Sequence, residues 1–124
     1  MHFHAERFAE ARAAYIEMER AGEASPASQA KLGAAEVRLG DVGTGIARMR
    51  AAVKSAPGFA ELYDILSAGA LLGGNVELAA QTAEARLSVG KPEPFHYELA
   101  AALHARLGDR KKARAILEQA RVSA

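Results

Sequence analysis

The sequence predicts an all-α protein, a right-handed α-solenoid built from antiparallel helix pairs. Two observations carry this prediction. Half of the residues are apolar but only 6% are aromatic, and alanine is frequent, a composition that favours closely packed helices over strands. A glycine-centred turn also recurs: "RLGDVGTG" at 38–45, "LLGGNVEL" at 71–78 and "RLGDRKKA" at 106–113 place Gly40, Gly74 and Gly108 at intervals of 34 residues.

Local signals place the individual helices between these turns. Ser25 precedes Pro26 as an N-cap would, and Glu93 before Pro94 repeats this less ideally. Each turn glycine should end a helix in the left-handed conformation, and the residue that follows it should cap the next helix. The capping residues would be Asp41, Asn75 and Asp109, while Pro57 and Pro92 close the second helices. The expected helices are 5–20, 26–39, 43–55, 60–73, 76–89, 94–107 and 110–122.

Short connections make successive helices antiparallel neighbours, and repeated pairs bury their apolar faces by stacking. The chain is expected to form one domain, with 1–24 as the second helix of a partial repeat. Three units follow at 25–58, 59–92 and 93–124, and the last lacks a capping helix. We therefore expect a module of a longer protein, with end-to-end self-association through apolar edges that contain Phe3, Phe8, Tyr15, Ile116 and Val122.

This pattern resembles the tetratricopeptide repeat (TPR) family, whose unit is a helix-turn-helix of 34 residues. The resemblance covers essentially the whole chain. Small residues recur at the closest helix crossing, and Gly45 belongs to that column. Glu36, His104 and Arg86 depart from the pattern, since the family often has tyrosine at the first two positions and alanine at the third. The matching residues are Ala11, Tyr15, Leu32, Gly33, Ala52, Pro57, Tyr63, Leu66, Ala79, Tyr97, Ala113 and Ala120.

The resemblance implies a concave groove, lined by the first helix of each pair, in which a partner peptide lies. Ala30 and Ala34 occupy positions where repeats that clamp a terminal carboxylate have lysine or asparagine, so such a clamp is not expected. The alanines fit a peptide groove and tight helix packing equally well. The groove residues implied are Lys31, Ala34, Val37, Arg38, Glu61, Asp64, Ala68, Leu71, Phe95, Glu98, Ala102 and Arg106.

Charge and composition limit the other classes of partner. The 16 basic and 15 acidic residues are interspersed, which argues against nucleic-acid binding. No apolar run approaches the roughly 20 residues needed to insert into a membrane, and the N-terminus lacks a signal-peptide core. The absence of cysteine leaves the redox compartment open and is compatible with the cytoplasm. An excess of arginine over lysine hints at a bacterial source.

No catalytic, metal or cofactor site is predicted. His96 and His104 lie eight residues apart, too far to share an ion; His96 is expected to be exposed and His104 packed, while His2 and His4 lie near the N-terminus. No serine lies in a Gly-x-Ser-x-Gly elbow. The glycine-rich "GDVGTGIAR" at 40–48 lacks the Gly-Lys-Ser/Thr ending of a phosphate-binding loop, and Gly45 fits the close-packing column instead.

Two functions remain open on this basis. The favoured one is a non-enzymatic scaffold that binds an unidentified peptide or protein in the groove. The alternative, which the resemblance suggests, is an accessory TPR domain of a bacterial enzyme such as a glycosyltransferase.

Overall fold

The computed structural model describes residues 2–123 of the chain and the side chains of residues 6–123. Within that range all regular structure is helical, as the composition predicts. The observed bounds lie within three residues of the expected ones. The helices are α1 (His2–Arg20), α2 (Pro26–Arg38), α3 (Val42–Ser55), α4 (Ala60–Leu72), α5 (Val76–Arg86), α6 (Pro94–Arg106) and α7 (Arg110–Ser123).

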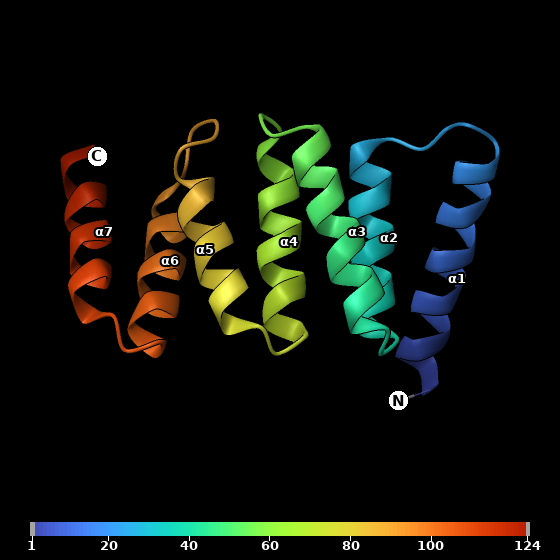
Figure 1. Cartoon of the computed structure of the whole chain (residues 1–124), viewed down its shortest axis with the longest axis horizontal. Coiled ribbons are helices and arrows are strands. Elements are labelled where there is room, and N and C mark those ends of the chain that lie inside the picture. The colour runs from blue at the N-terminus through green and yellow to red at the C-terminus, as the bar shows by residue number, and fades with distance from the viewer. Residues whose placement is uncertain (1, 124) are drawn as a thin grey trace.

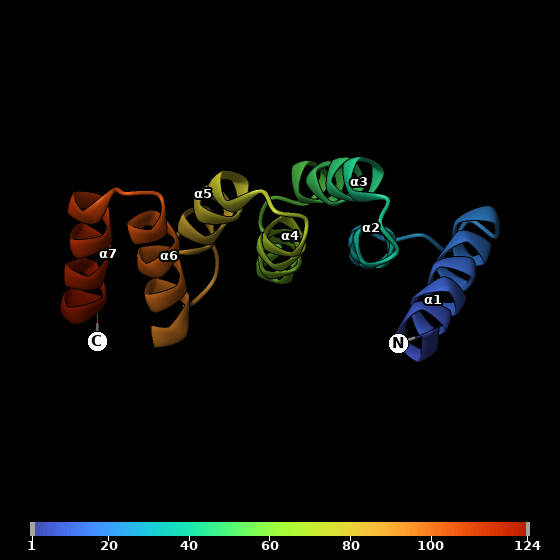
Figure 2. The same ribbon diagram turned by 90° about the horizontal axis from the view of Figure 1, so that it is seen from below.

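The helices stand side by side in chain order, and each packs against the next (Figure 1). Among helices that are not consecutive, only α2 and α4 pack on each other in this part of the chain. Seen from below, the row is curved, with α3 and α5 on one side of it and α2 and α4 on the other (Figure 2). The two sides of the row therefore present different helices to solvent.

The three turns predicted from the 34-residue interval have the same geometry. Gly40, Gly74 and Gly108 have φ of 95°, 84° and 88°. In each turn, the N–H of the residue after the glycine donates to the carbonyl five residues earlier, at 2.9, 2.8 and 2.9 Å. This hydrogen bond requires the left-handed conformation at the glycine, so the glycines end α2, α4 and α6 as predicted.

Side-chain capping bonds form as expected at Ser25, Asn75 and Asp109, but not at Glu93 or Asp41. Ser25 Oγ accepts from the N–H of Ser28 at 3.1 Å, and Ser28 Oγ accepts from the N–H of Ser25 at 2.8 Å. Asn75 and Asp109 each accept from the N–H three residues on, at 3.0 and 3.1 Å. The expectation for Asp41 is wrong in part: it precedes α3, but its side chain makes no capping bond.

The closest crossing in the molecule is that of α2 and α3. A Cβ on Gly45 would overlap the carbonyl oxygen of Gly33 and come within 2.9 Å of Val37 N. Met49 is fully buried next to this crossing and fills space left by Gly33 and by Gly69 of α4. Cβ atoms on those two glycines would lie 2.7 and 2.5 Å from atoms of Met49. The close crossing of α2 and α3 and the packing of α4 against Met49 thus both depend on glycine, which has no side chain.

The predicted apolar edge at the C-terminal end is wrong for Ile116. This side chain is buried with Ala113 in the core between α5, α6 and α7, because it lies on the face of α7 that packs against α6. Val122 is exposed as expected. Phe8 and Tyr15 are half-buried, and the side chains of His2, Phe3 and His4 lie outside those described.

We predict that Gly45→Ala destabilises the protein by about 1–3 kcal/mol, because its methyl group would meet backbone atoms that cannot move aside. The matched control is Gly43→Ala, two residues earlier in α3, where a Cβ has no neighbour within 4 Å. That change should leave stability unchanged or raise it by up to about 1 kcal/mol. Urea denaturation of the three proteins measures the difference. Equal midpoints for the two variants would contradict the close crossing.

Candidate functional site

A hollow of about 410 Å³ lies between α4 and α6, on the side of the row opposite α3 and α5. It exists because α4 does not pack directly on α6, in contrast to the contact between α2 and α4. Its walls are mostly apolar, with Phe95 55% exposed and Leu99 36% exposed. The lining residues are Asp64, Ser67, Ala68, Leu71, Phe95, Leu99 and Leu103.

A second hollow of about 260 Å³ lies between α1, α2 and α4. The guanidinium of Arg38 lies 4.9 Å from the centre of the Phe8 ring, a cation–π contact that holds α1 to α2. Lys31 Nζ lies 3.8 Å from Glu61 Oε1, and both side chains are half-exposed. The lining residues are Phe8, Ala11, Tyr15, Lys31, Ala34, Ala35, Arg38, Glu61 and Ile65.

These two hollows, which together we call the groove, collect most of the residues that the sequence assigned to a binding surface. The smaller hollow includes Lys31, Ala34, Arg38 and Glu61, and the larger includes Asp64, Ala68, Leu71 and Phe95. The other surface residues of the assignment are exposed on α6 but line neither hollow: Glu98, Ala102 and Arg106.

Val37 does not belong to the groove. It is 6% exposed and packs with Met49 and Leu66, because it lies on the face of α2 that meets α3 and α4. Ala30 is also fully buried, in the core with Ala52. Neither residue can contact a ligand in this conformation.

The sequence reasoning missed Leu99 and Leu103 of α6. A signal for them was present, since Phe95, Leu99 and Leu103 are spaced four residues apart and so form one apolar stripe along a helix. It also missed the contribution of Phe8 and Tyr15 of α1 to the smaller hollow.

Asp64, at the edge of the larger hollow, is held by two cationic or polar side chains from other helices. Its Oδ1 lies 3.2 Å from Arg86 Nε and 3.4 Å from His96 Nε2. Arg86 is buried and donates a second hydrogen bond, of 2.7 Å, to the carbonyl of Val89. The carboxylate of Asp64 therefore links α4 to α5 and α6. Its charge is already paired within the protein, so it is not free to bind a ligand.

The expectation that His96 is exposed is wrong. The ring is 5% exposed, and its Nδ1 accepts a hydrogen bond from the N–H of Glu93 at 2.8 Å. This bond makes Nδ1 an acceptor and leaves the proton of the neutral ring on Nε2, which lies near Asp64 without forming a hydrogen bond to it. His96 lies two repeat intervals after Ser28 and takes the same capping role, which the residue type alone did not indicate.

His104 is buried as predicted. Its Nε2 lies 2.9 Å from Glu84 Oε1, close enough for electrostatic contact although the angles are not those of a hydrogen bond. Glu84 also lies within 3.3 Å of Lys112 Nζ on α7. The histidine thus belongs to an ion-pair cluster that joins α5, α6 and α7.

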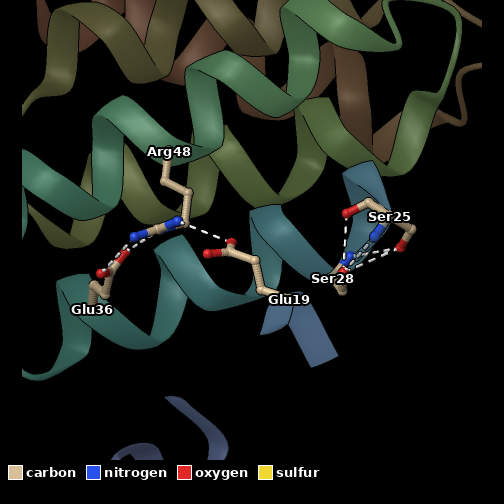
Figure 3. A network of polar contacts seen from close by, with 5 residues as sticks. All are labelled: Glu19, Ser25, Ser28, Glu36 and Arg48. Atoms are coloured by element: carbon tan, nitrogen blue, oxygen red, sulfur yellow. Dashed lines mark hydrogen bonds and ion pairs between the residues drawn. The ribbon is translucent and has the colours of Figure 1, made fainter. Parts of the chain in front are cut away.

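Glu36, a departure from the TPR pattern, anchors a polar network at the other end of the row (Figure 3). Arg48 of α3 donates to both carboxylate oxygens of Glu36, from Nε at 2.7 Å and from one terminal nitrogen at 3.3 Å. Its other terminal nitrogen lies 3.4 Å from Glu19 of α1. The hydrogen bond that Arg48 donates to Glu36 raises the pKa of Arg48 above its usual value. The network fastens α1, α2 and α3 together.

The described part of the chain contains neither a candidate metal site nor a candidate membrane span. No group of three or more histidine, aspartate and glutamate residues there could hold a metal ion. None of its helices has both the length and the apolar character needed to cross a lipid bilayer.

Comparison with known proteins adds no further guide to the site. No family model matches the chain, and no curated protein matches it.

We predict that Asp64→Ala lowers the free energy of unfolding by about 1–3 kcal/mol, because it leaves the buried guanidinium of Arg86 without its carboxylate. Glu61→Ala, one turn earlier in the same helix, removes only the half-exposed pair with Lys31 and should cost less than about 1 kcal/mol. Chemical denaturation of both variants measures the two costs. If Glu61→Ala lowered the free energy of unfolding as much as Asp64→Ala, the structural role assigned to the Asp64–Arg86 pair would be wrong.

Proposed function

We propose that this protein is a TPR-type scaffold, a right-handed α-solenoid that binds a segment of a partner protein in the groove and carries out no chemistry itself. The proposal is supported by the three equivalent glycine turns and by the small residues at the helix crossing. It is supported equally by the groove, to which eight of the twelve expected residues contribute.

The observation that carries this proposal is the exposed apolar lining of the larger hollow. Phe95 and Leu99 project apolar area into water beside the half-buried Leu71. Covering such area with a leucine or phenylalanine of a partner contributes about 1.5–3 kcal/mol per buried side chain. Apolar walls with few polar groups are typical of binding sites. We infer that a partner places one large apolar side chain in each hollow.

The charges around the groove bear on what the partner is. Glu61 and Asp64 are paired with Lys31 and Arg86, so the acidic groups at the rim are already neutralised. Arg106 of α6 is exposed and has no acidic partner among the described residues, but it lines neither hollow. A partner recognised mainly by its apolar side chains fits this surface better than a terminal carboxylate.

Selection from a phage-displayed peptide library tests the proposed function. We expect peptides with two large apolar residues to be enriched on the wild-type protein and to bind at least about ten-fold more weakly to Leu99→Glu, which places a charge in the larger hollow. The matched control is Leu117→Glu, at an exposed leucine of α7 outside the groove, which should bind like the wild type. Failure to enrich any peptide, or equal binding by Leu99→Glu, would overturn the proposal.

A further inference from the structure

A hollow of about 480 Å³, larger than either hollow of the groove, lies on the opposite side of the row. It is formed where α3 and α5 stand apart without packing on each other, with α4 between them (Figure 2). Leu66 and Leu78 contribute its apolar floor, and small side chains at Ala51 and Ala85 keep its mouth wide.

The 34-residue interval explains why no ion pair crosses this hollow, whereas one crosses the hollow of about 430 Å³ in the next gap along the row. Between α5 and α7, Glu84 pairs with Lys112 across the gap, at 3.3 and 3.4 Å. The residues one interval earlier are Arg50 of α3 and Leu78 of α5, which cannot form an ion pair. The first gap therefore has an apolar side chain where the second has a cation, and no ion pair crosses the first gap.

Arg50, which stands where the next gap has Glu84, also leaves a positive charge without a partner. Arg50 and Lys54 lie one helical turn apart on α3, both exposed, and both line the hollow. No acidic residue lines it, and neither cation has an acidic partner among the described residues. In a protein with nearly equal numbers of acidic and basic residues, this unpaired positive rim around an apolar floor is a distinct chemical feature.

We propose that this hollow, which we call the α3–α5 hollow, binds an acidic peptide segment of a partner protein. Two carboxylates of the segment pair with Arg50 and Lys54, which lie about 5–6 Å apart at their Cβ atoms. An apolar side chain between the carboxylates covers Leu66 and Leu78.

The shape of the hollow favours a peptide over an anionic lipid. Its rim residues Arg50, Ala51, Lys54, Gln81 and Ala85 are all exposed, so the hollow is a shallow, open depression. A small ligand such as a fatty acid is held by a cavity that encloses most of its surface. A side chain carried on a peptide needs only to be covered on one face, while the peptide backbone stays in water.

This binding surface is independent of the groove. The groove is formed by side chains of α1, α2, α4 and α6, whereas the α3–α5 hollow is formed by α3, α4 and α5. The two surfaces share α4 but no residue, so one partner can occupy each at the same time.

The test uses a capped octapeptide of four Glu-Leu repeats, titrated into the isotope-labelled full chain and followed by NMR. We expect saturable shifts at Ala51, Lys54, Gln81 and Ala85, and weakening of the affinity by at least about ten-fold in Arg50→Glu/Lys54→Glu. The matched control is Arg110→Glu/Arg114→Glu, which reverses two exposed cations at the same spacing on α7 and should bind like the wild type. Circular dichroism confirms that both variants fold.

Four outcomes would overturn the proposal. They are no saturable binding up to about 1 mM peptide, equal affinity for a capped peptide of Gln-Leu repeats, shifts confined to groove residues such as Leu71 and Leu99, and equal binding by the charge-reversed variant. Decanoate is titrated in parallel. Shifts at the same residues with decanoate but not with the peptide would assign the hollow to an anionic amphiphile and would also overturn the proposal.

Discussion

The rest of the structure depends on how closely the backbones of α2 and α3 approach each other at Gly33 and Gly45. Any Cβ at either position would overlap the facing backbone, so the helices touch along their main chains. This contact places the side chain of Met49 of α3 against Gly33 of α2 and Gly69 of α4. Met49 thereby positions α4 relative to α2 and α3. The position of α4 then decides which of its side chains line the groove and which line the α3–α5 hollow.

The features that the sequence predicted well are those set by one residue and its immediate neighbours. Gly40, Gly74 and Gly108 end helices because the left-handed conformation is open to glycine at no steric cost, wherever the rest of the chain lies. Ser25 caps α2 for a similarly local reason. Helix bounds and turn positions therefore follow from the sequence alone. The handedness of the stacking depends on the angle of each hairpin to the next, which no single residue determines.

The errors concern residues whose surroundings come from distant parts of the chain. Val37 was assigned to the groove because a 34-residue period gives the helices but not the rotation of each helix about its axis. A turn of one residue position, about 100°, moves a side chain from solvent into the core. His96 is buried, contrary to expectation, with the N–H of Glu93 and the carboxylate of Asp64 as its polar neighbours. Neither neighbour is visible from the residue type.

The glycine turns recur along the chain at a fixed interval, whereas the charged pairs do not. The first helix pair is tied by Glu36 and Arg48, the second by Asp64 and Arg86, and α5 is joined to α7 by Glu84 and Lys112. The first two pairs are not reproduced one interval later, where Ala70 and Thr82 and then Glu98 and Ala120 stand, and the third is not reproduced one interval earlier, where Arg50 and Leu78 stand. Because the glycines and alanines already fix the hairpins, the charged residues are free to differ without loss of the fold. Each gap between helices consequently has its own pattern of charge and apolar area. The two proposed binding surfaces therefore differ from each other at the positions where the repeat is broken.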